Sequence, residues 1–463
     1  MLPHPLRKVH FIGIAGAGMS AVAKLLRDSG VGVTGSDEGV YPPVSDFLQR
    51  ERIPYATPYA ARNVPADVDL IVIGKNARLV PATNAEVAAA VASKKPIASF
   101  PEILAHLSQG KETIVVAGSY GKSTCAALLA HCLEFVKTDP SFFIGAIPVT
   151  PTTSAQLGKG PHFVLEGDEY PSSNTDARAK FLHYRPRHLL LTPLAHDHVN
   201  IYPTVESYLK PFEELIQLPQ TITFCLDGPS SKKLHPRGAI TYGLQEGDYH
   251  AANIAWGEKT RFDLMHDGNA IAKMETTQLG EHNIQNIVGV CAFLLAQKLT
   301  TPQRAVAAVA AFKGVQRRLD RKSDKTSIPI FEGFGSSREK AQSAIAAVKR
   351  HFPDRRLIVV FEPHAFSWRN REFLAWYDDA FRGADKVFVF EPAAQGADTH
   401  DQLSQQEIVA RIGKSGIAAE PVPDQGALGN SLKANDAVLL LTSGNLGGLI
   451  EAIPRLAEQK FPA

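Results

Sequence analysis

Short apolar runs alternate with longer stretches of helical periodicity along most of this chain. Strand patterns occur at Val9–Ala15, Val31–Asp37, Leu70–Gly74, Phe163–Glu166, Leu189–Pro193, Leu357–Phe361, Lys386–Phe390 and Ala437–Thr442. Helical patterns occur at Cys125–Phe135, Arg338–His351, Leu374–Phe381 and Leu446–Leu456. Because such alternation is typical of parallel strands connected by helices, the pattern predicts an α/β fold with mainly parallel sheets.

The length of the chain sets the expected number of domains. A chain of 463 residues is long enough for about three domains of ordinary size. The polar stretch Ser108–Glu112 indicates the end of the first, and the Lys/Asp/Ser-rich patch Arg321–Ser327 is interpreted as a linker before the last. We therefore expect domains at residues 1–109, 110–325 and 326–463, with a β-richer region from Thr221 to Met274 in the second.

Composition narrows the class of protein. Apolar residues make up 44% and charged residues 21% of the chain, as in soluble globular proteins. The net charge of +2 gives no electrostatic reason to expect nucleic acid or an anionic membrane as a partner. The four cysteines lack metal-binding spacing and are expected to be reduced. With no signal peptide or membrane-spanning pattern in the sequence, we expect a cytoplasmic protein.

The segment Gly118-Ser-Tyr-Gly-Lys-Ser-Thr124 follows an apolar strand pattern and precedes a helical one. Glycines, a helix N-terminus, Lys122 and Ser123 in this order are typical of a loop that binds phosphates and Mg²⁺. Gly118 lies too close to Gly121 and Lys122 for the full Walker spacing. An ordinary strand-to-helix turn is therefore the alternative.

A second glycine-rich loop lies near the N-terminus. Gly16 and Gly18, with Ala21 at the third position, match the fingerprint of a dinucleotide-binding turn, and Asp37 ends the next strand pattern. The ligand would be a dinucleotide, as in a dehydrogenase, or a UDP-linked substrate. A tight turn without any ligand is the structural alternative.

Acidic residues and a histidine follow two of the strand patterns. Glu166, Asp168 and Glu169 are natural Mg²⁺ ligands beside a phosphate loop, and a solvated acidic loop is the alternative. Asp197 and His198 follow another strand, where a structural role is the simpler interpretation.

Two further motifs lie downstream. Asn283 and Asn286 stand nearly one turn apart at the start of a helical pattern. Capping explains Asn283 but not Asn286, which is a candidate contact for the same ligand. Arg317 and Arg318 are either a solvated pair or a clamp on nucleotide phosphates.

In this order and at these distances, the motifs resemble the Mur ligase family along nearly the whole chain. These are ATP-dependent amide ligases of peptidoglycan metabolism. The resemblance implies three domains: a Rossmann-like N-terminal domain that binds the UDP substrate, a P-loop ATPase-like central domain, and a Rossmann-like C-terminal domain. The last closes over ATP and binds the incoming amine.

Within the family, the chain most resembles the murein peptide ligase branch. The segments Gly35–Ser45 and Asp176–Arg187 carry this resemblance, the second as an insert between Glu166 and His198. It implies joining of L-Ala-γ-D-Glu-meso-diaminopimelate to UDP-N-acetylmuramate through an acyl phosphate, in peptidoglycan recycling. The alternatives are an L-alanine-adding ligase, a homologue with another amine substrate, or one that has lost turnover.

The resemblance also implies a role for each site residue. Lys122, Glu166 and His198 would be catalytic, and Ser123, Glu166 and His198 would hold Mg²⁺. The expected ATP contacts are Gly118, Ser119, Gly121, Lys122, Ser123, Thr124, Asn283, Asn286 and Arg318. The expected substrate contacts are Gly16, Gly18, Met19, Ser36, Asp37 and Arg369, with Arg371 as a further candidate. We expect a monomer or a weak homodimer.

Two segments and one single residue depart from the family pattern. Glu332–Ser337 replaces the usual Asp-Asp-aromatic segment with its two histidines, which leaves Gly333 where a second acid is expected. Asn200 stands where an acid is common, and Phe361–Arg369 resembles the alanine-adding branch more than the recycling branch. These departures bear on nucleotide binding and on the choice of amine more than on the fold.

Overall fold

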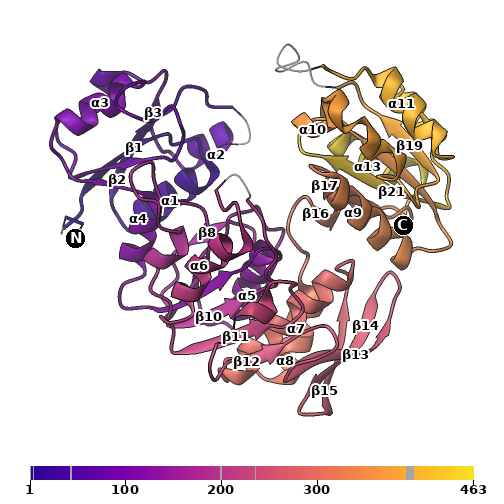
Figure 1. The fold of residues 1–463 in the computed structure, drawn as a ribbon, viewed down its shortest axis with the longest axis horizontal. Coiled ribbons are helices and arrows are strands. Elements are labelled where there is room, and N and C mark those ends of the chain that lie inside the picture. Colours follow the sequence, from indigo (N-terminus) through magenta and orange to yellow (C-terminus); the bar gives the residue numbers. More distant parts are fainter. Residues whose placement is uncertain (1, 4, 42–43, 199–200, 235, 393–400) are drawn as a thin grey trace. The chain divides into compact units, whose positions relative to one another are not determined.

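A computed structural model describes residues 2–3, 5–41, 44–198, 201–234, 236–392 and 401–463 (Figure 1). Pro42 and Pro43, which belong to the segment Gly35–Ser45, lie outside the described residues. Asn200, which departs from the family pattern, also lies outside them. Contacts group the chain into two compact units. The first contains Met1–Ala252, Asp263–Lys273 and Gln285–Phe312, and the second contains Asn253–Phe262, Met274–Ile284 and Lys313–Ala463.

The first sheet has the strand order β3-β2-β1-β4-β5, and its neighbouring strands pair in parallel. This is the order of a Rossmann sheet, in which ligands bind at the carboxyl ends of the strands. Its elements are β1 (Lys8–Ile12), α1 (Ala17–Asp28), β2 (Gly32–Ser36), α2 (Val44–Arg50), β3 (Tyr55–Ala56), β4 (Leu70–Ile73), α3 (Ala85–Ala92), β5 (Ile97–Ala98) and α4 (Phe100–Leu107).

The second sheet runs β8-β7-β9-β6-β10-β11-β12 and continues through β13, β14 and β15. Its strands are β6 (Glu112–Ala117), β7 (Ser141–Phe143), β8 (Ala155–Gln156), β9 (His162–Glu166), β10 (His188–Leu191), β11 (Thr221–Cys225), β12 (Ile240–Tyr242), β13 (Tyr249–Ala255), β14 (Thr260–His266) and β15 (Asn269–Thr276). Its helices are α5 (Lys122–Phe135), α6 (Val205–Leu215), α7 (Glu281–Ala296) and α8 (Pro302–Ala311). The five strands from β11 to β15 confirm the β-richer region that the sequence predicted.

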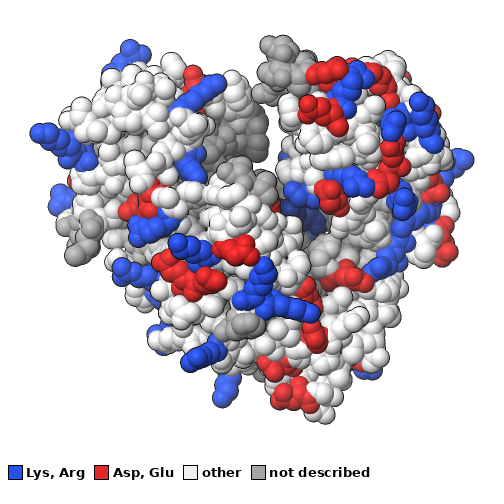
Figure 2. All heavy atoms as spheres, viewed as in Figure 1, with Lys and Arg blue, Asp and Glu red and all other residues white. Residues whose placement is uncertain are grey.

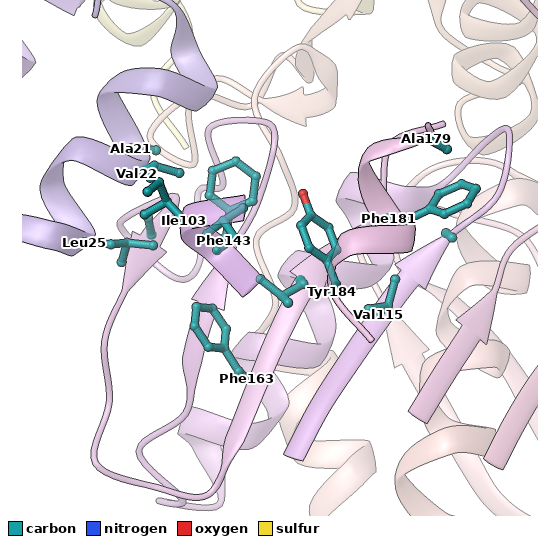
Figure 3. Packing of buried hydrophobic residues seen from close by; sticks show 14 of the residues in the cluster. Ala21, Val22, Leu25, Ile103, Val115, Phe143, Phe163, Ala179, Phe181 and Tyr184 are labelled. Carbon is teal, nitrogen blue, oxygen red and sulfur yellow. The ribbon is translucent and has the colours of Figure 1, made fainter. Parts of the chain in front are cut away.

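One buried apolar cluster extends through the first and second sheets. Figure 3 shows Val22 and Leu25 of α1 with Ile103 of α4 on one side, and Phe163 of β9 and Val115 of β6 in the same cluster. Burying a side chain of this size contributes about 1.5–3 kcal/mol. The shared core explains why the first sheet and most of the second belong to a single compact unit.

The third sheet, in the second unit, has the order β16-β17-β21-β18-β19-β20. Alternate residues of β18 enter different cores: Val359 packs in the cluster with α9, and Ile358 packs in the cluster with α13. Both faces are therefore covered by helices, as in a parallel α/β sheet (Figure 1). The elements are β16 (Arg318–Arg321), β17 (Ile330–Phe334), α9 (Arg338–His351), β18 (Arg356–Phe361), α10 (Phe366–Arg369), η4 (Arg371–Asp378), β19 (Lys386–Val389), α11 (Gln405–Lys414), β20 (Ala418–Pro421), α12 (Gln425–Ser431), β21 (Asp436–Thr442) and α13 (Leu449–Lys460).

The predicted linker at Arg321–Ser327 is wrong. Strand β16 ends at Arg321 and pairs antiparallel with β17, so it forms one edge of the third sheet. The Ser323 hydroxyl then donates to Glu458, and Thr326 donates to the carbonyl of Phe461 at 2.8 Å. Polar residues in this segment therefore bond to the C-terminal helix. The proposed limits of three domains stay a prediction.

The face of the molecule drawn in Figure 2 carries charged residues of both signs. On the face drawn in Figure 2, lysines and arginines are interspersed with aspartates and glutamates. Within the described residues, each helix is too short or too polar to cross a bilayer.

Candidate functional site

The loop between β6 and α5 has the shape of a phosphate cradle. Gly118 and Gly121 have φ angles of +135° and +85°, which L side chains rarely adopt. A Cβ atom would lie 2.1 Å from the Thr192 hydroxyl at Gly118, and 2.3 Å from the Asn286 side-chain oxygen at Gly121. Space and conformation thus both require glycine, and the loop leads directly into the N-terminus of α5.

Lys122, the first residue of α5, directs its ammonium group back over the loop. Its Nζ donates to the carbonyl of Gly118 at 2.7 Å and to the Glu169 carboxylate at 2.9 Å. The Lys122 side chain is mostly buried, at 15% exposed, and that of Glu169 is fully buried. The predicted phosphate lysine therefore lies in the cradle, held by a carboxylate to which the sequence assigned only a general metal-binding role.

Ser123 and Glu166 meet beside the same loop. Strands β6 and β9 pair in parallel with Val116 opposite Glu166, so both strands end at one edge of the sheet. The Ser123 hydroxyl donates to Glu166 Oε1 at 2.8 Å, and the Gly145 amide donates to Oε2 at 2.6 Å. Burial raises the pKa of Glu166, although these two hydrogen bonds oppose the shift. The structure thus brings two of the three predicted metal ligands together.

His198 follows β10 and reaches the same edge through Glu169. Its Nε2 lies 3.1 Å from Glu169 Oε1, so one carboxylate contacts both His198 and Lys122. The hydrogen bond to Glu169 raises the pKa of His198, against the opposing effect of burial. The signal that could have identified Glu169 is its position three residues after Glu166, just past the end of β9.

The arrangement fits Mg²⁺ and a nucleotide polyphosphate. Around the loop, Ser123 and Glu166 offer hard oxygens, and Lys122 with the backbone amides at the start of α5 offers positive charge. Among the described residues, no group of three or more His, Cys, Asp or Glu could hold a metal ion. Mg²⁺ commonly completes its coordination with phosphates and water, so a sparse protein contribution suits it.

Other predicted ATP contacts lie around this loop or in the second unit. The Ser119 hydroxyl donates to the carbonyl of Ala195 at 2.7 Å, which fixes the loop to the segment after β10. Thr124 is half-buried in the first turn of α5, and Asn286 is buried with its side-chain oxygen 3.3 Å from the Cys125 sulfur. In the second unit, Asn283 donates to the carbonyl of Leu279 at 2.8 Å, and Arg318 is exposed at the start of β16.

The N-terminal glycine loop and Asp37 also come together. Gly16 is the N-cap of α1, and the amide of Ala15 donates to Asp37 Oδ2 at 2.8 Å. The Tyr59 hydroxyl donates to the other oxygen of Asp37 at 2.9 Å; burial and the charge of Asp37 together raise the pKa of Tyr59. Tyr59 has no motif around it, so no sequence pattern indicated this contact.

The remaining predicted substrate contacts of the first sheet differ in exposure. Gly18 lies where a Cβ atom would meet the ring of Phe100 at 3.4 Å, and Met19 is buried at 5% exposed. Ser36 is fully buried and its hydroxyl donates to Glu86, so its side chain faces the interior. The carbonyl of Ser36 accepts from the amides of Gly13 and Ile14 at 2.9 and 3.1 Å, so this end of β2 supports the glycine loop.

One of the two predicted arginines of the second unit is buried, and the other forms ion pairs within that unit. Arg369 is 8% exposed, at the end of α10. Arg371 forms ion pairs with Asp401 at 2.7 Å and Glu407 at 2.6 Å, so two carboxylates of its own unit hold it. These observations weaken the expectation that either side chain lies open to a substrate carboxylate.

The segment Glu332–Ser337, which departs from the family pattern, begins in β17, where Gly333 lies against apolar side chains. A Cβ atom at Gly333 would lie 3.0 Å from a methyl group of Leu441, and Ala344 lines the same space. An acidic side chain at Gly333 would therefore enter an apolar core. Glu332 instead accepts from Lys322 at 2.6 Å and pairs with Arg317 at 3.4 Å.

Comparison with known proteins supports the interpretation of these loops. The family model described as "Mur ligase family, catalytic domain" matches residues 8–112. The model described as "Mur ligase middle domain" matches residues 116–294. The chain is 30% identical to the UDP-N-acetylmuramate–L-alanine ligase of Halorhodospira halophila, over 96% of this chain and 92% of the relative. It belongs to the Mur ligase family. The two glycine-rich loops thus lie in the two matched regions.

Solved structures of Mur ligases share the fold. The crystal structure of the UDP-N-acetylmuramate-alanine ligase of Thermotoga maritima superposes with a TM-score of 0.78, at 23% identity, covering 98% of this chain and 99% of that chain. A UDP-N-acetylmuramate:L-alanyl-γ-D-glutamyl-meso-diaminopimelate ligase from Neisseria meningitides superposes with a TM-score of 0.61, at 28% identity, covering 67% of this chain and 100% of that chain. The expected α/β Mur ligase fold is confirmed.

Membership in the family establishes the class of reaction. Mur ligases are ATP-dependent enzymes that form an amide bond between a carboxylate and an amine in peptidoglycan synthesis. This Mur ligase is therefore an ATP-dependent carboxylate–amine ligase, which excludes the dehydrogenase alternative. The identity of its amine and the role of each site residue are proposals.

Proposed function

We propose that this Mur ligase joins L-alanine to the lactyl carboxylate of UDP-N-acetylmuramate, at the expense of ATP. The observation that carries the proposal is the likeness to the Halorhodospira halophila relative, which has that named activity and matches this chain along 96% of its length. The sequence motifs favoured the tripeptide of the recycling branch as the amine substrate. The comparison supports the alanine-adding alternative better.

In this proposal, the phosphate loop holds the ATP polyphosphate. Lys122 neutralises the transferred phosphate group, and Ser123 and Glu166, with His198, hold Mg²⁺. Bound Mg²⁺ would supply positive charge that offsets the charge on the phosphate oxygens. The 2.8 Å hydrogen bond between Ser123 and Glu166 supports this assignment, because it places two hard oxygen donors beside the loop.

The protein's main task in this chemistry is positioning. ATP converts the carboxylate to an acyl phosphate, which the incoming amine then attacks. Lys122 offers up to three donors to oxygens, and the helix N-terminus of α5 offers backbone amides. At the first sheet, Asp37 and the Gly13–Gly18 loop would hold the UDP group, since the loop ends at the N-terminus of α1.

Tripeptide ligation is the second candidate, and an ordered insert after β9 favours it. Pro171 forms an isolated bridge with Ala179, and Asp176 accepts from Arg178 at 2.7 Å. The side-chain amide of Asn174 donates to the carbonyls of Asn76 and Leu79 at 2.8 and 3.0 Å. The insert Asp176–Arg187, which carries the resemblance to the recycling branch, is thus folded, and Asn174 just before it bonds to the segment after β4.

A product assay separates the two amines. The enzyme is incubated with Mg-ATP, UDP-N-acetylmuramate and equal concentrations of L-alanine and the tripeptide, and the UDP-linked products are measured by mass. The proposal predicts the alanyl product in excess. An excess of the tripeptide product would overturn it in favour of the second candidate.

The Lys122→Ala variant tests the ATP site itself. It should reduce amide formation at least about a thousandfold, because loss of the lysine removes positive charge from the phosphates. The exposed lysine Lys232 provides a control, and Lys232→Ala should retain the wild-type rate. A normal rate in Lys122→Ala would contradict the assignment of the phosphate loop.

A further inference from the structure

Glu169 contacts both Lys122 and His198, and the metal-binding role expected from the sequence does not explain these two contacts. Its side chain is fully buried, and its carboxylate accepts from Lys122 at 2.9 and 3.3 Å. The same carboxylate lies 3.1 Å from His198 Nε2. Its backbone carbonyl accepts from the Tyr202 hydroxyl at 2.6 Å, which fixes the residue from the other side.

The ammonium group of Lys122 has its donors directed at protein oxygens. A lysine has three N–H donors. They face the carbonyl of Gly118 at 2.7 Å, the carbonyl of Ser119 at 3.5 Å and the carboxylate of Glu169. Phosphate oxygens can recruit this ammonium group only by replacing some of these acceptors.

His198 is held by contacts on three sides. Its backbone has a φ of +55°, and its amide donates to Asp197 Oδ1 at 2.7 Å. The ring of Tyr170 meets its imidazole edge-on, with 4.4 Å between the ring centroids. The Glu169 carboxylate completes this arrangement at Nε2 and thereby fixes which way the imidazole points.

We propose that Glu169 is a positioning residue that holds Lys122 in the nucleotide-free enzyme, yields it to the nucleotide phosphates, and keeps His198 oriented throughout. This inference rests on the proposed ATP site. It assigns Glu169 a role in nucleotide affinity that differs from metal ligation. Glu169 competes with phosphate for one lysine, and a carboxylate near phosphate also repels it.

Two effects of opposite sign follow. Removing the charge of Glu169 should tighten nucleotide binding, because Lys122 loses its strongest internal partner. It should also slow amide formation, because His198 loses the contact that orients it and the tighter ADP leaves more slowly. A variant that merely damaged the fold would weaken nucleotide binding and slow the reaction together.

The test compares Glu169→Gln with the wild-type enzyme by calorimetric titration with Mg-ADP and by steady-state kinetics. We expect the Kd for Mg-ADP to fall about tenfold, because one competing charge is lost at a partly buried site. We expect kcat and the KM for ATP to fall together. An unchanged or higher Kd for Mg-ADP in the variant would overturn the inference.

Two further variants keep the result interpretable. Glu213→Gln removes an exposed carboxylate of α6, outside the candidate site, and should leave the Kd for Mg-ADP within about twofold of wild type. An equal tightening in this control would overturn the specific role of Glu169. If Glu169→Gln does not fold, Glu169→Asp replaces it: its shorter carboxylate cannot contact Lys122 and His198 together, but it keeps the charge, so the Kd for Mg-ADP should fall by less than about tenfold. An unchanged Kd in this variant would overturn the inference.

Lys122→Ala distinguishes failure of this inference from failure of the proposed function. The variant should weaken Mg-ADP binding. If it does, and Glu169→Gln leaves the affinity unchanged, only the role of Glu169 is wrong. If Lys122→Ala binds Mg-ADP as tightly as wild type, the loop is not the nucleotide site and both proposals fall.

Discussion

At the scale of single residues, glycine conformation decides the shape of the phosphate loop. Gly118 has a φ of +135° and no room for a Cβ atom, because the Thr192 hydroxyl would lie 2.1 Å away. Gly110 also has a positive φ, of +77°, but a Cβ atom there would meet nothing within 4 Å. Substitutions at these two glycines therefore distinguish the effect of a positive φ alone from the effect of a positive φ combined with a steric clash.

We predict that Gly118→Ala abolishes detectable Mg-ADP binding, because the clash with Thr192 moves the loop out of the cradle. Gly110→Ala should cost about 1 kcal/mol of stability through its φ alone and leave nucleotide affinity unchanged. Thermal midpoints and titration with Mg-ADP check both variants. Equal nucleotide affinity in Gly118→Ala and wild type would show that the loop tolerates the side chain.

Individual contacts were the least predictable part of the site. The motif around Lys122 predicted a phosphate loop correctly in shape, because spacing and glycines determine local backbone geometry. The partner of Lys122 depended on the pairing of β9 and β10 on either side of β6, which no local pattern specifies. Tyr59 and Glu86 were missed for the same reason: their contacts with Asp37 and Ser36 span 22 and 50 residues.

At the scale of elements, a buried carboxylate joins several strands and helices of the first sheet. Glu86, in the first turn of α3, is fully buried and accepts from His10 of β1 at 2.9 Å and from the Ser36 hydroxyl of β2. It also accepts from the amide of Ala60 at 3.0 Å and from Asn63 at 2.8 Å. This network fixes the end of β2, next to Asp37.

We predict that Glu86→Ala lowers stability by about 3 kcal/mol, because several buried donors lose their acceptor. The KM for UDP-N-acetylmuramate should rise while the KM for ATP stays constant, since the network supports the first sheet alone. Glu206 occupies the same first-turn position in α6 but is exposed, so Glu206→Ala should change neither quantity. A matching rise in the KM for ATP would contradict this assignment.

The effect of Glu86→Ala should depend on pH. Burial raises the pKa of Glu86, but the hydrogen bonds from His10, Ser36 and their neighbours outweigh burial and bring it below the ordinary value of 4.5. A lowered pKa means that the stabilisation is present above pH 4.5 and is lost as pH falls through the lowered value. The difference in thermal midpoint between wild type and variant should therefore shrink below pH 4.5. A constant difference would contradict the charged state of Glu86.

Regular elements were predicted best where their pattern was strongest. The helix at Arg338–His351 and the strand at Leu357–Phe361 follow their apolar periodicity closely. The expected helix at Leu374–Phe381 is instead a 3-10 segment, η4, at Arg371–Asp378. Strand β16 was missed because Arg318–Arg321 is mostly charged, and its pairing with β17 rather than any apolar pattern makes it a strand.

At the scale of the whole molecule, the edge strand β16 determines where the third sheet begins. Within this unit, Lys322 donates to the buried Glu332 at 2.6 Å, and Leu319 packs in the same core as Ala344. The boundary predicted at residue 326 would remove both contacts. A boundary at Lys313, where the second compact unit resumes, keeps them.

We predict that a fragment of residues 313–463 melts about 10 °C above a fragment of residues 326–463. The shorter fragment exposes an unpaired sheet edge and leaves the Glu332 carboxylate buried without Lys322, which costs about 3–5 kcal/mol. Thermal unfolding followed by circular dichroism compares the two fragments, which lack the same upstream contacts. Midpoints within about 2 °C of each other would contradict the structural role of β16.

The central claim is that this enzyme activates a carboxylate with the γ-phosphate of ATP before amide formation. The most direct measurement uses UDP-N-acetylmuramate labelled with ¹⁸O in its carboxylate, together with Mg-ATP and the preferred amine. Attack by the carboxylate on the γ-phosphate, followed by amine attack on the acyl carbon, predicts one ¹⁸O atom in the released phosphate for each amide formed. Release of unlabelled phosphate, with amide formation, would contradict the account.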